Sequence, residues 1–306
     1  MNDNEGSNKV KLQVDRPGLV TINHRSSYGA ITPLRPELSQ AGRTVLITGA
    51  SAGIGLSTAR AFAEASATTV IITGRRKDKI EAVVSDLSNE FRKTKFEGRV
   101  CDVSSDIEST ALWDGLKADS VVVDVLVLSA AKFSGHESIL DSGLEATWSL
   151  YETNVRPLLH FTEKLYKQDD INGRKKFVVY VSTAAIHSKP VAAALPGYTL
   201  SKASGHLAMQ KIAAEVDANK MQIVTFHPGA ILSESAKNAG MNENSYPWDD
   251  DNLPAHFAVW AATAEAATLH GRFVWATWDI KELLSGDLSK RMEIDPDFLT
   301  ISFVGI

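Results

Sequence analysis

The sequence predicts a single α/β domain built on a doubly wound, seven-stranded parallel sheet with helices on both faces. Three observations lead to this prediction: seven short β-branched runs recur along the chain, longer amphipathic segments separate them, and the runs are almost wholly apolar. Strands of a parallel sheet are covered on both faces and therefore read as continuous apolar runs rather than alternating ones. Regular strand–helix alternation is typical of doubly wound folds.

The expected strands follow one another at intervals that leave room for a helix between most neighbours. They span residues 44–48, 69–73, 98–101, 121–128, 177–181, 222–226 and 273–275. The expected helices span residues 54–65, 77–91, 106–116, 144–166, 198–216 and 254–269. In the first helix Ile54, Ala59 and Phe62 fall on one stripe, which is the pattern of a helix packed against a sheet.

Composition excludes several classes of protein. The 306 residues are 44% hydrophobic and 23% charged, which is ordinary for a globular chain and excludes disordered and fibrous classes. The net charge of −5 argues against nucleic acid or an anionic membrane as partner. A single cysteine, Cys101, cannot form an internal disulfide and indicates a reducing compartment, so we expect a cytoplasmic protein.

Targeting, membrane and metal signals are lacking in the sequence. The longest apolar stretch, residues 121–131, contains Asp124 and is far shorter than the about 20 residues of a membrane span. The first ten residues are polar and do not resemble a secretory signal. The eight histidines and Cys101 show no paired-ligand spacing, so we predict no metal.

The chain divides into one domain with two extensions. No internal repeat or linker splits it, and residues 1–42 lack clean periodicity, which is typical of an N-terminal arm laid over a domain. We expect the catalytic domain to span residues 43–280 and a C-terminal extension to span residues 281–306.

The first chemistry-bearing motif lies where the first expected strand turns into a helix. It reads Thr48-Gly49-Ala50-Ser51-Ala52-Gly53-Ile54-Gly55. Glycines at such a turn let the backbone bend tightly and approach a pyrophosphate, which the free N–H groups of the helix N-terminus attract. A plain glycine-rich turn is the alternative, but the strand-to-helix position favours a dinucleotide site.

The second motif is Tyr198-Thr199-Leu200-Ser201-Lys202, and it has two interpretations. One is an ordinary pair one turn apart on a helix surface. The other is chemical, because a neighbouring ammonium favours the phenolate and makes tyrosine a usable acid or base near neutral pH. The motif follows a strand that ends in Ser182-Thr183, which favours the chemical interpretation.

Together these residues resemble the short-chain dehydrogenase/reductase family, with its TGxxxGxG cofactor motif and YxxxK active site, over residues 43–278. The resemblance implies a Rossmann-type fold and a catalytic tetrad in which Asn154, Tyr198 and Lys202 match the family pattern. It also implies cofactor contacts from Gly49, Ser51, Gly53, Ile54, Gly55, Asp102, Asn154, Tyr198, Lys202, Ile231 and Ser233. The flanking segments resemble fungal members, many of which serve secondary metabolism.

Two departures from the family pattern leave questions open. The catalytic hydroxyl falls on Ser182 or Thr183; the local pattern favours Thr183, but its spacing to Tyr198 is longer than is usual in the family. The family's Asn-Asn-Ala-Gly appears as residues 128–131 with the sequence LSAA, which lacks a side-chain amide.

The end of the second strand indicates the choice of cofactor. NAD-binding members usually have an acid there, whereas an arginine suits a 2′-phosphate. This chain has Thr73-Gly74-Arg75-Arg76-Lys77, so we predict NADP(H), less so NAD(H), with Arg75 as the phosphate contact. A solvated basic helix start is the alternative.

The resemblance therefore implies an NADP(H)-dependent carbonyl reductase or alcohol dehydrogenase that acts on a small-molecule ketone, aldehyde or alcohol. An NADP(H)-binding member with a cyclase, isomerase or regulatory role is the alternative. Residues 234–262 lie where the family carries its substrate lid, and the two long helices at 144–166 and 198–216 imply a homodimer or homotetramer.

Overall fold

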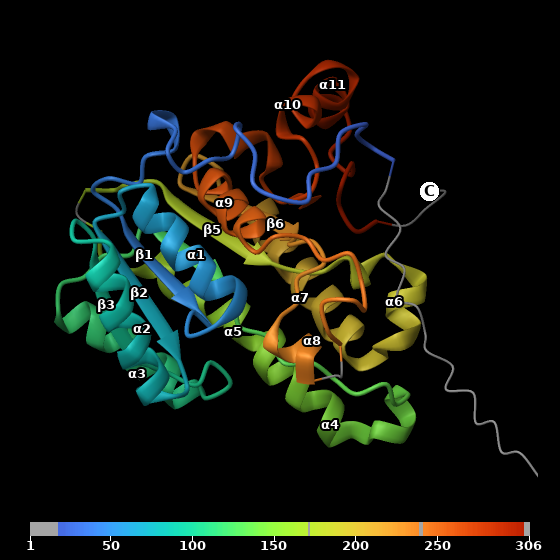
Figure 1. The fold of residues 1–306 in the computed structure, drawn as a ribbon, viewed down its shortest axis with the longest axis horizontal. Helices are drawn as coiled ribbons and strands as arrows, with labels where there is room; N and C mark the ends of the chain where they lie inside the picture. The colour runs from blue at the N-terminus through green and yellow to red at the C-terminus, as the bar shows by residue number, and fades with distance from the viewer. Residues whose placement is uncertain (1–17, 171, 239–240, 303–306) are drawn as a thin grey trace, which may run out of the picture.

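The computed structural model describes residues 18–170, 172–238 and 241–302, and in this part of the chain seven parallel strands form one sheet (Figure 1). They are β1 (Thr44–Thr48), β2 (Thr69–Gly74), β3 (Lys95–Val100), β4 (Val125–Leu128), β5 (Lys176–Val181), β6 (Met221–His227) and β7 (Phe273–Trp275). The sheet order is β3-β2-β1-β4-β5-β6-β7. The chain winds outward from β1 to one edge and then from β4 to the other, which confirms the predicted doubly wound parallel sheet.

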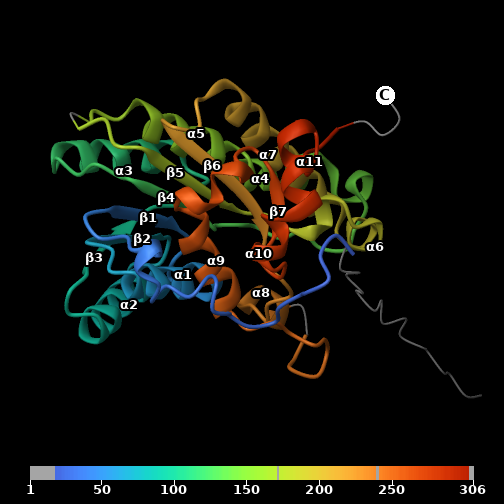
Figure 2. The ribbon, with the colours of Figure 1, turned by 90° about the horizontal axis from the view of Figure 1, so that it is seen from above.

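Helices cover both faces of the sheet. They are α1 (Gly53–Glu64), α2 (Lys77–Glu90), α3 (Asp106–Ala118), α4 (Ile139–Asn154), α5 (Arg156–Lys167), α6 (Lys189–Ala194), α7 (Pro196–Glu215), α8 (Glu234–Asn238), α9 (Asn252–Ala261), α10 (Ile280–Leu283) and α11 (Gly286–Ile294). Figure 2 shows α1, α2 and α9 on one side of the sheet and α3, α5 and α7 on the other. Three short 3-10 helices complete the described part: Pro36–Leu38, Ala184–Ile186 and Ala264–Leu269.

Alternation along each strand divides the core into two clusters. In β1, Val45 and Ile47 join the cluster under α1, α2 and α9, whereas Leu46 joins the one under α3, α5 and α7. Both kinds of position are fully buried. This is why the strands read as unbroken apolar runs.

The long helix expected at 144–166 is two helices, α4 and α5, that meet at Val155. Pro157 occupies the first turn of α5, where its missing N–H costs nothing, but it cannot continue a helix from α4. The expected helix at 254–269 likewise ends at Ala261, and a 3-10 segment follows it. Strand β3 starts three residues earlier than expected. It is an edge strand with a half-exposed pattern, so its first residues do not read as an apolar run.

The described part of the N-terminal arm, residues 18–42, lies against the domain. Ile31 and Leu38 are fully buried in the core cluster beside α9. His24 donates its backbone N–H to Thr277 O (2.7 Å), and Asn23 forms an antiparallel bridge with Trp278. No helix in the described residues is long and apolar enough to cross a membrane.

Candidate functional site

The glycine-rich turn between β1 and α1 can be closed only with glycines. Gly49 has a φ of +69°, and a Cβ there would lie 2.9 Å from Ala130 Cα. A Cβ on Gly55 would lie 2.5 Å from the carbonyl oxygen of Gly49. A side chain at either position would therefore push the turn apart.

The LSAA segment packs directly on this turn. The backbone N–H groups of Ser129 and Ala130 donate to Thr48 Oγ1 at 3.0 and 3.2 Å. The segment after β4 is thus fixed to the Thr-Gly motif through the backbone, although it lacks the family's amide side chain.

A cavity of about 440 Å³ opens beside the N-terminus of α1. It is lined by Gly53, Ile231–Glu234, Lys237 and Asp249–Asp251. No side chain caps the first turn of α1, so its N–H groups remain available to an anion. The structure thus brings the expected cofactor residues Gly53, Ile231 and Ser233 to one hollow, where the N–H groups of α1 are donors for an anion and the carboxylates of Glu234 and Asp249–Asp251 are the opposing charges.

Arg75 and Asp102 follow two neighbouring strands at the same edge of the sheet. Arg75 is exposed directly after β2. Asp102 follows β3, and its Oδ1 accepts hydrogen bonds from the backbone and side chain of Ser104. The neighbouring Arg76 and Lys79 both form ion pairs with Glu234 of α8 at 3.8 and 3.5 Å, so two cations share one carboxylate at this end of the cavity.

Asp249 holds the loop after β6 in place. It is buried, its Oδ2 accepts from the backbone N–H of Ala230 (2.9 Å), and its own N–H donates to Ala230 O (2.7 Å). Gly229, at φ +95°, leaves room for the carboxylate, since a Cβ there would lie 2.8 Å from Oδ2. Asp249 thereby fixes the start of the stretch that reaches Ile231 and Ser233.

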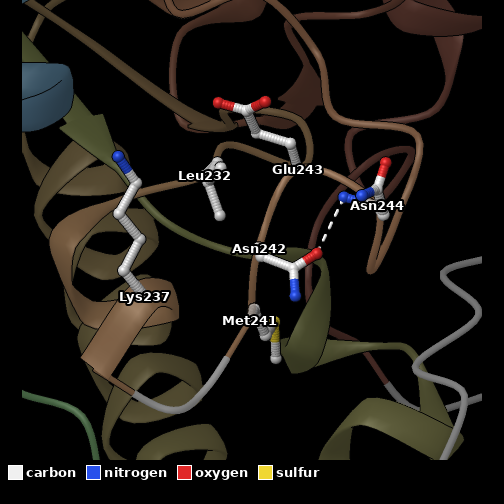
Figure 3. Close-up of a pocket in the computed structure, with 6 residues that line it drawn as sticks. All are labelled: Leu232, Lys237, Met241, Asn242, Glu243 and Asn244. Atoms are coloured by element: carbon white, nitrogen blue, oxygen red, sulfur yellow. Dashed lines mark hydrogen bonds between the residues drawn. The ribbon is translucent and has the colours of Figure 1, made fainter.

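The segment expected as a lid, residues 234–262, has two different parts. Helix α9 is buried against α1 and belongs to the core, so only the stretch before it covers the cavity; residues 239–240 lie outside the described part. A second hollow of about 280 Å³ adjoins the cavity, and Figure 3 shows Leu232, Lys237, Met241, Asn242, Glu243 and Asn244 around it.

Tyr198 lies near the start of α7 and is almost completely buried. Its backbone N–H donates to Ser134 Oγ (3.1 Å), and its ring stacks on Phe133. Burial raises the pKa of the Tyr198 phenol, and the side chain of Thr183 opposes this. Burial is the larger of these two effects on the pKa of the Tyr198 phenol, and the effect of Lys202 on it stays a prediction.

Of the two candidate hydroxyls, Thr183 is the one whose side chain acts on the pKa of the Tyr198 phenol. Thr183 also caps the short helix Ala184–Ile186 by accepting from Ala185 N–H (3.2 Å). Ser182 is buried at the end of β5 on the side of Tyr180, where its side chain acts on the Tyr180 phenol. These surroundings favour Thr183 over Ser182 as the candidate hydroxyl, and the assignment stays a prediction.

Lys202 lies one turn after Tyr198 on α7 and is completely buried. Its Nζ donates to the carbonyl oxygen of Val181 at the end of β5 (2.8 Å). Burial lowers the pKa of Lys202 to about 7, since an ammonium group loses its hydration there.

Asn154 ends α4 and is also buried. Its Oδ1 accepts from Lys132 N–H (2.8 Å), and its Nδ2 donates to Lys132 O (2.8 Å) and to Ser201 Oγ (2.9 Å). One side chain thus joins the loop after β4 to α7, between Tyr198 and Lys202.

Sequence reasoning missed Phe133, Tyr180 and helix α6. The segment between Thr183 and Tyr198 is longer than the family pattern and contains α6, whose Val191 packs with Tyr198. The long spacing between Thr183 and Tyr198 was the feature of the sequence that could have indicated α6. Among the described residues, no group of three or more His, Cys, Asp and Glu side chains could hold a metal ion.

Comparison with known proteins agrees with this architecture. The family model for short chain dehydrogenases matches residues 43–244. The chain is 33% identical to the short chain dehydrogenase/reductase AacuD of Aspergillus aculeatus, over 92% of this chain and 95% of that protein. It is also 33% identical to a short chain dehydrogenase/reductase of Claviceps purpurea, over 93% and 94% of the two chains.

Solved structures share the fold. The L-sorbose reductase of Gluconobacter frateurii, complexed with NADPH and L-sorbose, superposes with a TM-score of 0.69 over 78% of this chain and 96% of that one, at 19% identity. The RhlG/NADP complex of Pseudomonas aeruginosa superposes with a TM-score of 0.69 over 79% and 97%, at 21% identity. With the parallel sheet, the glycine turn and the matches over most of its length, this chain belongs to the short-chain dehydrogenase/reductase family of oxidoreductases.

Proposed function

We propose that this chain is an NADP(H)-dependent carbonyl reductase or alcohol dehydrogenase acting on a small-molecule ketone, aldehyde or alcohol. Three observations support the proposal: Lys202 lies one turn after Tyr198 on α7, Asn154 donates to Ser201 between them, and the side chain of Thr183 acts on the Tyr198 phenol. When bound, the nicotinamide cofactor supplies hydride to a carbonyl carbon or takes it from an alcohol.

Tyr198 is the proposed acid. Its phenol donates a proton to the substrate oxygen during reduction and takes it back during oxidation. Thr183, which faces this phenol, hydrogen-bonds the same oxygen and holds the carbonyl in place. Ser182 is the weaker candidate for this role because its hydroxyl lies on the side of Tyr180.

Lys202 and Asn154 support the acid. A buried ammonium beside the phenol favours the phenolate that proton transfer leaves, and it offers donors to a ribose hydroxyl. Asn154 holds the loop after β4 against α7, and we assign to it the water that returns a proton to the site.

Arg75 supports the choice of NADP(H). An exposed guanidinium follows β2, further cations flank it, and the end of that strand has no acid to bind a ribose 2′-hydroxyl. The proposed cofactor contacts are those expected from the sequence: Gly49, Ser51, Gly53, Ile54, Gly55, Arg75, Asp102, Asn154, Tyr198, Lys202, Ile231 and Ser233.

We also propose a homodimer or homotetramer in the cytoplasm, with a role in fungal secondary metabolism. Exposed apolar side chains lie along α4: Leu144 (78% exposed) and Trp148 (59%) follow the break in this helix at Gly143, and Leu140 (92%) precedes it. Helices α5 and α7 pack beside α4 and expose Leu159 and Leu207. A second copy of the chain would cover this surface.

The test is loss of NADPH absorbance with a panel of ketones and aldehydes. Tyr198→Phe should abolish turnover but keep NADPH binding, measured by quenching of tryptophan fluorescence. Tyr166→Phe is the matched control, because Tyr166 is exposed on α5. Full activity in Tyr198→Phe would refute the assignment, and binding of NADPH without reduction of any carbonyl would favour a non-redox member.

A further inference from the structure

The ammonium group of Lys202 lies over an aromatic ring that is not part of the family motif. Its Nζ is 4.4 Å from the ring centroid of Tyr180, on β5, and 2.8 Å from Val181 O. Both side chains are 1% exposed. Within the described ranges no carboxylate forms an ion pair with Lys202, so a carbonyl dipole and a ring face are the partners that its charge has.

The ring of Tyr180 matters because the charged and neutral forms of Lys202 are close in free energy at neutral pH. Removing an ammonium group from water disfavours the charged form, and here burial lowers its pKa to about 7. The face of an aromatic ring attracts a cation, and the attraction grows where water is excluded. The ring therefore acts at a position where a small change decides whether Lys202 carries a charge at neutral pH.

The ring cannot move away from the lysine. Tyr180 is paired on both sides, with Leu128 of β4 and Thr225 of β6. Helix α7 presses on its far end at Gly205, where a Cβ would lie 3.0 Å from the Tyr180 hydroxyl oxygen and 2.7 Å from Leu158 Cδ1. Glycine at this position lets α7 come close enough to bring Lys202 over the ring.

The hydroxyl of Tyr180 does not explain why this residue is here. It is buried, and its polar neighbour is the side chain of Ser182; in the described part of the chain neither hydroxyl forms a hydrogen bond of normal geometry. A buried hydroxyl without a partner is a cost to the folded state. The useful part of Tyr180 is therefore its ring.

We propose that Tyr180 is a positioning residue whose ring face keeps the Lys202 ammonium group charged and fixed at the end of β5. The purpose of this arrangement rests on the proposed function, since a charged Lys202 is what the acid Tyr198 needs beside it. The contact between ring and ammonium is a property of the protein alone, and it can be measured without substrate or cofactor.

The experiment follows the 13Cε chemical shift of Lys202 against pH in lysine-labelled protein without cofactor, with the signal assigned by its loss in Lys202→Met. Tyr180→Leu removes the ring, and the titration midpoint should fall by about one pH unit, a tenfold change in acidity. Tyr180→Phe keeps the ring and should leave the midpoint in place. Phe161→Leu is the control, because Phe161 is a fully buried ring in the same core cluster that packs on Trp113.

An unchanged midpoint in Tyr180→Leu, or an equal fall in Phe161→Leu, overturns the proposal. If Tyr180→Leu does not fold, phenylalanine and pentafluorophenylalanine at position 180 provide the comparison, because fluorination removes the negative potential of the ring face at nearly constant shape. The fluorinated ring should lower the midpoint, and equal midpoints overturn the proposal. A shifted midpoint in a protein that reduces no carbonyl would sustain this inference and refute the proposed function instead.

Discussion

Phe133 stacks on Tyr198 with ring centroids 4.5 Å apart and ring planes 16° from parallel. Phe133 comes from the loop after β4, and 45% of it is exposed, so one face covers the phenol while the other borders solvent. Ser134, the next residue, accepts the backbone N–H of Tyr198 at 3.1 Å and fixes this loop to the start of α7. A molecule that approaches Tyr198 from the loop after β4 would contact the ring of Phe133.

Replacing Phe133 should weaken the binding of apolar substrates. An aromatic contact of this kind is worth about 1 kcal/mol, so Phe133→Ala should raise KM for bulky ketones severalfold and change kcat less. Phe133→Leu keeps an apolar side chain over Tyr198, so its KM for bulky ketones should lie between those of the unaltered protein and Phe133→Ala. Steady-state kinetics across a series of ketones of increasing size measure this, and an unchanged KM throughout the series would contradict it.

Arg75 should distinguish the two nicotinamide cofactors. A charge-assisted hydrogen bond to phosphate is worth about 1.5–3 kcal/mol, so Arg75→Ala should raise the Kd for NADPH at least tenfold and leave that for NADH unchanged. Fluorescence titration measures both constants. Arg92→Ala is the control, because Arg92 is an exposed arginine that follows the other end of α2. Tighter binding of NADH than of NADPH by the unaltered protein would refute the NADP(H) assignment.

The buried Lys202 should make stability depend on pH. Its pKa is lowered to about 7 in the folded protein, so between that value and the ordinary lysine value the unfolded chain binds more protons. Stability should therefore rise with pH from about 7 to about 9, by at most about 1.4 kcal/mol per pH unit from this residue. Above that range the raised pKa values of Tyr180 and Tyr198 act in the opposite sense, because only the unfolded phenols ionise.

Urea unfolding of the protein without cofactor at pH 7, 8 and 9 measures this slope. Lys202→Met should flatten it, because the titrating group is gone. Lys211→Met should not, since Lys211 is exposed on the same helix. Parallel slopes for the unaltered protein and Lys202→Met would show that Lys202 is not held near neutrality.

The apolar face of α4 should control assembly. Leu144→Asp or Trp148→Lys places a charge where the proposed interface needs apolar contact, and either change should convert the oligomer to monomer. Size-exclusion chromatography with light scattering measures the mass. Lys167→Asp, at the exposed end of α5, serves as the charged control. A monomer before any substitution would refute the oligomer proposal.

The sheet could be predicted because its signals are local. Each strand except β3 is a largely apolar run, and the turn after β1 needs glycine at Gly49 and Gly55 for steric reasons that a sequence displays directly. The break at Val155 is also local, but the amphipathic pattern continues through it, and Pro157 was the only warning. Periodicity reports which face a helix buries and not whether the helix is continuous.

The surroundings of the candidate site depend on contacts that no spacing encodes. Tyr180 reads as one more apolar residue in β5, and only the approach of α7 places Lys202 over its ring. The choice between Ser182 and Thr183 likewise depends on which way each residue points at the end of a strand. Motifs identified the candidate site residues, but the groups that surround them are visible only in three dimensions.

Contacts of the described arm (residues 18–42) and of β7 limit where the chain can be truncated or exchanged with a relative. Residues 43–244, which the family model covers, contain neither β7 nor α9, and they omit Ile31 and Leu38 from the core. Asp250 donates its backbone N–H to Arg25 O (2.7 Å), so the arm also touches the stretch that borders the cofactor cavity. A chimaera with a relative, or a shortened version for crystallisation, should therefore keep the described arm, α9 and β7 together with the rest of the sheet.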